Sequence, residues 1–479
     1  MRKVKRTGTL ILLLVVSFLL FSRLTEASPL RVSSNGRSLV WNDGTPFFWL
    51  MDSAQALLTQ LSREDVDLYL EIRANFGFTV IETNVMSFIG YNAANVYGDV
   101  PFINGDPTRP NEPFWQHVDY VVNKAASLGL VIALVPDRQL VIIGDDWRPG
   151  PLNESSAYEY GRFVGQRYRG KPVVWILAWD VQPMGREAVF TALADGIADG
   201  SGGGNHKNVL ITFHTSPTGR FIGHSSSYFF NEYSWLDFNS VYSSHRDDNE
   251  SYGFPETYSL IEADYFLSPV RPVVDMEPPY ESVFDGIFDG RDSRGPRMGA
   301  DVIRRKAYWS VFAGAFGFAF GNIDIVTFHK PGQASINGSS QYWKDALFSP
   351  ASMEMQYLRK LIESRCQLLL TPDQSMIVSD VGSGQSHIRA TRGSDGSYAF
   401  VYVPDGRSFS IDTRSLGERF AANWFNPRNG SYISIGQFTS SESHGFDPPG
   451  TPQLGNDWVL VLDSDRSGGE TVCRSDQAG

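Results

Sequence analysis

Two acidic side chains follow apolar runs of the sequence almost directly. Asp180 comes two residues after the run 173–178, and Glu277 comes two residues after the run 272–275. Hydrolysis of a glycosidic bond needs two carboxyl groups that flank the bond. One protonates the departing oxygen, while the other attacks the anomeric carbon or activates a water molecule. We therefore expect Asp180 and Glu277 to form the catalytic pair of a glycoside-cleaving enzyme.

Other polar and aromatic side chains stand at or just after further apolar runs. Such positions favour contacts with a substrate, because binding sites place a few polar and aromatic groups around an otherwise packed pocket. Each residue also has a structural alternative, namely a bond to a neighbouring loop or packing in the core. The candidates for substrate binding are Asp52, Asn84, Trp179, His214, Tyr242, His245 and Tyr280.

The sequence lacks the motifs of several other enzyme classes. None of the 8 histidines is followed by Glu, so the zinc motif His-Glu-x-x-His is absent. Neither a Gly-x-Ser-x-Gly elbow nor a Gly-x-Gly-x-x-Gly fingerprint occurs. Clustered metal ligands with suitable spacing are also missing. We expect no catalytic metal and no cofactor.

The candidate residues stand on a regular alternation of short apolar runs and helical patterns. Apolar strands separated by helices indicate a parallel sheet that is buried on both faces. Eight such units predict a (β/α)₈ TIM barrel, an α/β fold whose active site lies at the carboxyl ends of the strands. Strands 4 and 7 face each other across the barrel and would carry the two carboxylates. The expected strands are 47–51, 79–83, 130–135, 173–178, 209–212, 238–242, 272–275 and 318–320.

The pattern changes near residue 370. Short strand-like segments then alternate with turn signals, and no helical pattern intervenes. This predicts a small C-terminal antiparallel β-sandwich. We expect a catalytic barrel over 28–370, a non-catalytic accessory sandwich over 371–465 that docks on the barrel, and a polar, disordered tail over 466–479.

Residues 1–27 have the layout of a secretory signal peptide. A basic start precedes the apolar run 10–21, and Ala27 offers a small residue for cleavage. An uncleaved anchor is the alternative, although a membrane span needs roughly 20 apolar residues. We expect a secreted, extracellular protein without membrane contact after cleavage. In a bacterium, its place would be the periplasm or the cell surface.

Charge and special residues narrow the partners. Because 1–27 hold five basic side chains and one acidic one, the remaining chain has a net charge of −16, without a basic cluster. Nucleic acid is therefore excluded as a partner, and we expect a monomer that acts on a poly- or oligosaccharide. Cys366 and Cys473 could form one bridge or remain two free thiols. Candidate glycosylation sites are Asn153, Asn249, Asn337 and Asn429.

Several stretches resemble one known family. The sequence is similar to the apiosidase-like glycoside hydrolases (family 140), whose barrel is joined to a domain described as "putative collagen-binding domain of a collagenase". The resemblance covers essentially the whole chain after the signal segment. Among the stretches that carry it are 211–214 (ITFH), 235–239 (WLDFN), 272–278 (PVVDMEP), 426–430 (NPRNG) and 457–463 (DWVLVLD).

The resemblance implies a retaining glycosidase, with Asp180 as acid/base and Glu277 as nucleophile. It also implies release of the branched pentose apiose from pectin side chains. The sequence departs from the family pattern in strand 1, where Gln55 replaces Trp, and before the acid/base, where Trp179 replaces Gly. The hypothesis is thus an apiosidase-like enzyme acting on plant or microbial cell-wall glycans. The alternative is a catalytically silent barrel that binds glycans or cell wall.

Overall fold

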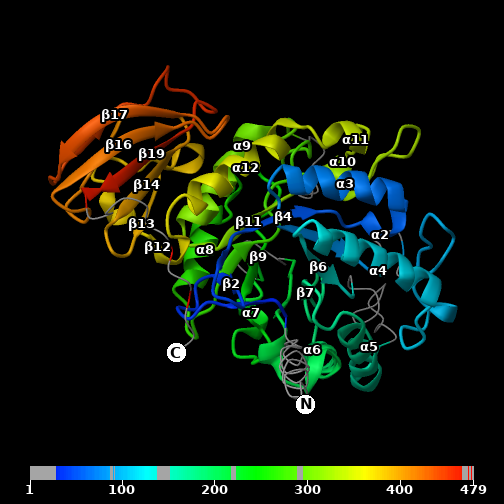
Figure 1. The fold of residues 1–479 in the computed structure, drawn as a ribbon. Helices are drawn as coiled ribbons and strands as arrows, with labels where there is room; N and C mark the ends of the chain where they lie inside the picture. Colours follow the sequence, from blue (N-terminus) through cyan, green and yellow to red (C-terminus); the bar gives the residue numbers. More distant parts are fainter. Residues whose placement is uncertain are drawn as a thin grey trace, which may run out of the picture.

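The computed structural model describes residues 28–86, 90, 92–137, 152–216, 223–287, 295–465, 473 and 476. The expected signal peptide, 1–27, lies outside the described residues. A parallel barrel and a β-sandwich follow one another along the chain (Figure 1).

Eight parallel strands form the barrel, in the order β8-β7-β6-β5-β4-β11-β10-β9. Between the two outer members, β8 and β9, the backbone N–H of Asp237 donates to Ile211 (2.9 Å) and the Thr212 hydroxyl donates to the Phe238 carbonyl (2.7 Å). These bonds close the sheet and confirm the predicted TIM barrel. The strands are β4 (Trp49–Ser53), β5 (Val80–Asn84), β6 (Val131–Val135), β7 (Val173–Ile176), β8 (Ile211–Thr212), β9 (Asn239–Val241), β10 (Val273–Asp275) and β11 (Gly317–Phe320).

Helices surround the barrel, and local sequence sets their limits. Ser62 caps the first long helix by accepting a hydrogen bond from the Asp65 backbone (3.3 Å). The carbonyl of Tyr158 in α5 lies where a side chain at Gly196 of α6 would begin, 2.1 Å from a Cβ built there. Glycine therefore permits the close packing of these two helices. The long helices are α3 (Arg63–Asn75), α4 (Glu112–Ser127), α5 (Glu154–Arg167), α6 (Glu187–Gly202), α8 (Thr257–Tyr265), α9 (Ala300–Phe312) and α12 (Pro350–Glu363).

Several short elements did not emerge from the sequence pattern. An N-terminal antiparallel sheet of β1 (Leu30–Val32), β2 (Leu39–Trp41) and β3 (Pro46–Phe47) contributes Leu30, Leu39 and Phe47 to the apolar cluster inside the barrel. It thereby covers one end of that core. Four α-helices of a single turn were also not predicted from the sequence: α2 (Leu57–Gln60), α7 (Ser227–Phe230), α10 (Ile323–Val326) and α11 (Trp343–Ala346).

The second domain is antiparallel, as predicted. Six strands pair in the order β12-β13-β14-β19-β16-β17, and β15 pairs separately with β18. Between β12 and β13, Gln374–Met376 form a 3₁₀ turn, and Ile377 makes an isolated antiparallel bridge to Ile411. The strands are β12 (Leu370–Pro372), β13 (Arg389–Gly393), β14 (Tyr398–Val403), β15 (Phe409–Ile411), β16 (Arg419–Phe425), β17 (Tyr432–Thr439), β18 (His444–Phe446) and β19 (Trp458–Ser464).

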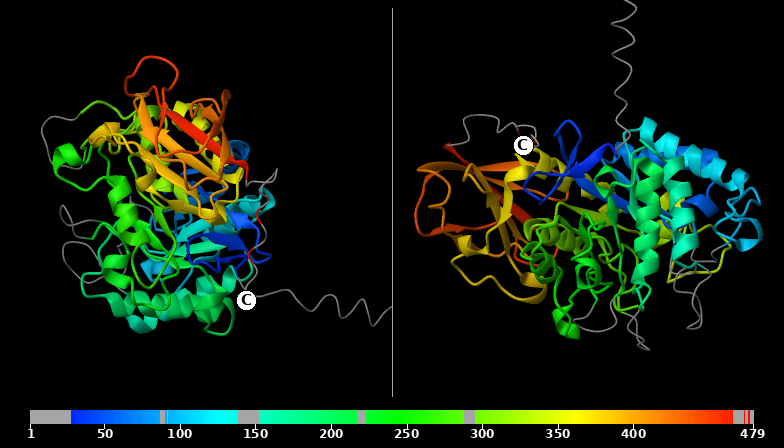
Figure 2. Two further views of the ribbon diagram at one scale, coloured as in Figure 1. Left: turned by 90° about the vertical axis from the view of Figure 1, so that its left-hand side faces the viewer. Right: turned by 90° about the horizontal axis from the view of Figure 1, so that it is seen from below.

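The sandwich packs on one side of the barrel, against α9 and α12 (Figures 1 and 2). Tyr308 of α9 stacks on Tyr402 of β14, with ring centroids 4.9 Å apart. Beside the rings, the guanidinium of Arg304 donates two hydrogen bonds of 2.9 Å to the carboxylate of Asp457. One apolar cluster therefore runs across both domains.

The end of the chain returns to the body of the protein. Cys366 forms a disulfide with Cys473, which decides between the two alternatives left open by the sequence. The carboxylate of Asp476 pairs with Arg31 (2.7 Å) and accepts from the backbone of Ser34 (3.0 Å). At 473 and 476, the expectation of a disordered tail therefore does not hold, and the rest of 466–479 lies outside the described residues.

Candidate active site

Glu277 lies just after the end of β10, and two imidazoles hold its carboxylate. Nε2 of His214, which follows β8, is 2.9 Å from Oε2 of Glu277. Nε2 of His245, which follows β9, is 3.0 Å from Oε1. Both oxygens thus have a fixed partner, and the carboxylate is almost fully buried.

The charge of Glu277 follows from these contacts. Burial would raise the pKa of its carboxyl, but the hydrogen bonds from His214 and His245 outweigh burial and lower the pKa to about 2. The backbone N–H of Tyr280 points at Nδ1 of His245 (3.4 Å), so that nitrogen accepts and Nε2 carries the hydrogen. Glu277 is therefore ionised at neutral pH and is oriented by donors on both sides.

Asp180 and Glu277 line the same cavity, of about 240 Å³. Asp180 follows β7 and is half-buried, with a backbone φ of 59°. Few residues other than glycine adopt this left-handed conformation, although Asp and Asn do so more readily than most. The barrel thus brings the two predicted catalytic carboxylates to one cavity at the carboxyl ends of its strands.

Three predicted substrate contacts also line this cavity: Tyr242, His245 and Tyr280. The ring of Tyr280 lies edge-on to the imidazole of His245, at a centroid distance of 4.6 Å. Gly321 leaves room for Tyr280, because a Cβ built there would lie 2.1 Å from its ring. Burial raises the pKa of the Tyr280 hydroxyl well above its usual value, which keeps that hydroxyl protonated.

Further lining residues were not predicted as substrate contacts. Gln55 is the one that the sequence could have revealed, since it lies two residues after the end of strand β4, as the predicted candidates lie after theirs. Asn337 was considered only as a glycosylation site. The other lining residues come from loops and short helices, whose positions cannot be predicted from the periodicity of the sequence. They are Ser216, Val283, Ile323 and Val326.

Asp52 does not belong to the cavity, contrary to the expectation that it contacts substrate. Its carboxylate is fully buried and accepts hydrogen bonds from Arg73 (2.6 Å) and Tyr69 (2.5 Å), both on α3. Side chains alternate between the two sides of a strand, and that of Asp52 faces the outer helix. It joins the barrel wall to α3.

Trp179 and Asn84 also lie apart from the residues that line the cavity. The indole of Trp179 is fully buried in the apolar core inside the barrel, where it contacts His214 rather than narrowing the pocket. Asn84 is 1% exposed, and neither atom of its side-chain amide has a hydrogen-bond partner among the described residues. Neither residue is among those that line the cavity, and His214 reaches the site through Glu277.

Of the four glycosylation candidates, Asn249 is ruled out by its surroundings. It is 1% exposed, and its amide nitrogen donates to the carbonyls of Ser243 (2.8 Å) and Pro255 (2.9 Å). A glycan on that nitrogen would replace one of the two donated hydrogens and would have no room in so buried a place. Asn153, Asn337 and Asn429 are exposed.

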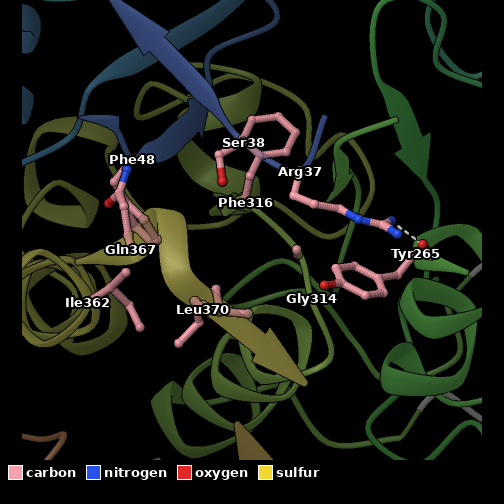
Figure 3. A pocket seen from close by; sticks show the side chains of 11 residues that line it. Arg37, Ser38, Phe48, Tyr265, Gly314, Phe316, Ile362, Gln367 and Leu370 are labelled. Carbon is pink, nitrogen blue, oxygen red and sulfur yellow. Dashed lines mark hydrogen bonds between the residues drawn. The ribbon is translucent and has the colours of Figure 1, made fainter. Parts of the chain in front are cut away.

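A second cavity lies away from the carboxylates, between the N-terminal sheet, the α9–β11 connection and residues 362–370. Figure 3 shows Arg37 and Tyr265 on one side of it and Ile362 and Leu370 on another. Its volume is about 20 Å³, which is room for about one water molecule. It is too small for a sugar, and no carboxylate is among its lining residues.

Two features are absent from the residues that the structure describes. No group of three or more His, Cys, Asp or Glu side chains there could hold a metal ion. Within those same residues, no helix is long and apolar enough to cross a bilayer.

Comparisons with known proteins agree with this geometry. Residues 33–368 match the family model "Apiosidase-like, catalytic domain", and 371–463 match "Putative collagen-binding domain of a collagenase". No curated protein sequence matches. A solved structure described as "Glycoside hydrolase" is 30% identical with a TM-score of 0.82, and the match covers 92% of this chain and 97% of that one. A glycoside hydrolase family 5 structure from Bacteroides vulgatus gives 30% and 0.82, with 94% and 96% covered.

The barrel and its pair of carboxylates define a glycoside hydrolase that acts on a carbohydrate substrate. Within that class, the chain belongs to the apiosidase-like family, and its C-terminal part matches the "Putative collagen-binding domain of a collagenase".

Proposed function

We propose that the protein is a secreted, retaining glycosidase that cleaves plant or microbial cell-wall glycans, with Glu277 as nucleophile and Asp180 as acid/base. One observation carries this proposal. A carboxylate whose pKa is lowered to about 2 lines the same cavity as a second carboxyl group, and two imidazoles fix its orientation. A nucleophile must be ionised and aimed, and Glu277 meets both conditions.

The proposed reaction has two steps. Glu277 attacks the anomeric carbon while the bond to the leaving oxygen breaks, and Asp180 gives that oxygen its proton. A glycosyl ester on Glu277 results. Asp180, now a carboxylate, then removes a proton from water, whose oxygen displaces Glu277 from the anomeric carbon. The sugar leaves with its original anomeric configuration.

Apiose on a pectin side chain is the substrate that the family suggests first. In the proposed complex, the sugar hydroxyls would face Gln55, Tyr242 and Asn337, which line the cavity together with the two carboxylates. Gln55 supplies an amide where related sequences have an aromatic ring, so the contacts of the bound sugar would differ there.

For the second domain, we propose a supporting role. Trp424 and Trp458 are buried in its own apolar core, and a second group of its apolar side chains, among them Phe400 and Tyr402, packs in one cluster with α9 and α12. The disulfide supports the proposed secretion, since such bonds persist in oxidising compartments.

A screen for released reducing sugar would test the proposal, with pectin fractions and aryl glycosides as substrates. We expect turnover of at least one substrate, loss of turnover in Glu277→Gln, and a product that proton NMR first shows in the substrate's anomeric configuration. Initial release of the inverted anomer would reject the retaining mechanism. Binding of glycans without turnover would favour the silent barrel.

A further inference from the structure

A hollow lies beside the catalytic cavity, and it is distinct from the small cavity of Figure 3. It has a volume of about 400 Å³ and is open to solvent. The chain segment 280–283 borders both spaces, since Tyr280 and Val283 line the cavity while Glu281 and Ser282 line the hollow. The stretch from Asn337 to Tyr342 is divided in the same way, because Asn337 lines the cavity and Tyr342 lines the hollow. The two spaces are therefore neighbours, separated by short pieces of chain.

Two buried carboxylates fix the walls of this hollow. Glu281 accepts hydrogen bonds from the Ser349 hydroxyl and from the Ala351 backbone (3.0 Å), which holds the start of α12. Asp324 accepts from the backbone N–H groups of Ser340 (2.6 Å) and Gln341 (2.9 Å), which holds the part of the wall that Gln341 forms. The hollow is therefore formed in advance, as ligand sites usually are.

The lining has the chemistry of a sugar site. Phe348 is 53% exposed, and Tyr342, which lines the same hollow, is half-buried. Exposed aromatic rings offer an apolar face for the C–H groups of a sugar. Gln341 and Asp345 are exposed and can exchange hydrogen bonds with hydroxyl groups.

The charges of the residues that line the hollow favour neutral sugars over acidic ones. The carboxyl groups that line the hollow are those of Glu281 and Asp345, and among the described residues no lysine or arginine lines it. A uronic acid would bring a like charge next to Asp345, which is unfavourable. A neutral sugar meets no such repulsion.

We propose that this hollow, lined by Glu281, Ser282, Gln341, Tyr342, Asp345, Phe348, Ser349 and Pro350, binds a neutral sugar unit of the same glycan whose reacting unit occupies the catalytic cavity. The inference rests on the proposed function, because it takes the neighbouring cavity as the place of cleavage. It makes the protein an enzyme for branched or oligomeric glycans rather than for isolated monosaccharide glycosides.

Two substrates separate this binding from the chemistry. The first is the aryl monoglycoside that the wild type hydrolyses best, and the second is a neutral oligosaccharide fraction from pectin side chains, freed of acidic members by anion exchange. Tyr342→Ala and Phe348→Ala should lower kcat/KM on the oligosaccharides about tenfold or more and change it less than about twofold on the monoglycoside. Tyr228→Ala is the matched control, since Tyr228 is 61% exposed and lines neither space. Thermal melting confirms that each variant folds.

Equal losses on both substrates, or no loss on either, would overturn the inference. So would better binding of an acidic oligosaccharide fraction than of the neutral one. If the wild type hydrolyses nothing, the proposed function fails, and calorimetric titration with the neutral fraction still decides the inference. Binding that weakens about tenfold in Tyr342→Ala but not in Tyr228→Ala would support the sugar site in a silent protein. Unchanged or absent binding would reject it.

Discussion

The indole of Trp179 lies against the imidazole of His214, with ring centroids 4.3 Å apart and an angle of 37° between their planes. His214 in turn contacts Glu277, so a fully buried core residue supports a partner of the nucleophile. We expect Trp179→Leu, which keeps much of the bulk and loses the ring, to lower kcat about tenfold with little change in KM. Trp179→Phe should lose less. Steady-state kinetics on folded variants check this, and equal losses in both variants would contradict a role for the ring contact.

The low pKa of Glu277 depends on two donors. Without His245, burial should raise the pKa of the nucleophile, so the acid limb of the kcat/KM profile should move to higher pH by about one unit or more in His245→Phe. His245→Gln restores a neutral donor and should shift the limb less. Profiles measured from pH 3 to 8 would test this. An unmoved limb in both variants would show that another group controls it.

A substitution of Asp180 can change both the charge and the backbone conformation at this position, so two variants are needed to separate the effects. The φ of 59° at Asp180 suits Asn but strains Ala, so Asp180→Asn removes the proton donor with less disturbance of the chain. We expect Asp180→Asn to lose about a hundredfold or more on glycosides with poor leaving groups and much less on aryl glycosides with acidic phenols. Asp180→Ala should behave alike and also melt at a lower temperature. An equal loss on both kinds of glycoside would speak against acid catalysis by Asp180.

Stability should increase as the pH falls from 8 toward 5. Burial raises the pKa of Asp237 to about 8, of Asp275 to about 7 and of Asp264 to about 6, from an ordinary 3.8. The folded protein therefore binds more protons than the unfolded chain in this range, and stability is lost as the pH rises through these values. Glu277 acts oppositely, but only below its ordinary value of 4.5, while His117, whose pKa burial lowers from 6.5 to about 4, opposes part of the trend between these two values.

Melting curves between pH 5 and 8 would measure this trend. Asp264→Asn should flatten the part of the trend below about pH 7, because the amide cannot ionise. The same change at Asp447, which is exposed, should leave the trend as it is. A melting temperature that rises steadily toward pH 8 would contradict the expectation.

The contact between the domains should contribute to stability and not to chemistry. Tyr402→Ala removes the ring stacked on Tyr308 and leaves a gap in the shared apolar cluster, which should cost about 3 kcal/mol of unfolding free energy. Tyr432→Ala is the control, since Tyr432 is 46% exposed on β17. Denaturant titration gives the free energies, and kcat should stay unchanged in both. A loss of kcat in folded Tyr402→Ala would show that the sandwich affects catalysis.

Deleting the sandwich should expose the apolar sides of α9 and α12. We expect the isolated barrel to lose solubility before its chemistry is affected. A soluble, stably folded barrel without turnover would contradict the supporting role.

The sequence predicted the strands and long helices well, because apolar periodicity reports burial directly. It placed Asp180 and Glu277 correctly at one cavity, since both follow strands that face each other. The sequence could not show toward which side of the barrel wall each residue near a strand end points. Asp52 and Trp179 were therefore expected in the pocket. Packing decides the position of both residues: Asp52 faces α3, and Trp179 lies within the barrel core. The walls built by α10 and α11 depend on loop bonds such as those of Asp324, which leave no periodic trace.

The disulfide changes the mechanical character of the second domain. Cys366 precedes the sandwich and Cys473 follows it, so both ends of the domain are anchored. A domain that is joined to its neighbour by one linker can rotate about that linker, whereas a domain attached at both ends keeps its orientation. Any long polymer that touches both domains therefore meets two surfaces in a constant mutual orientation. A single cut in an exposed loop of the sandwich would also leave its two fragments joined to the barrel.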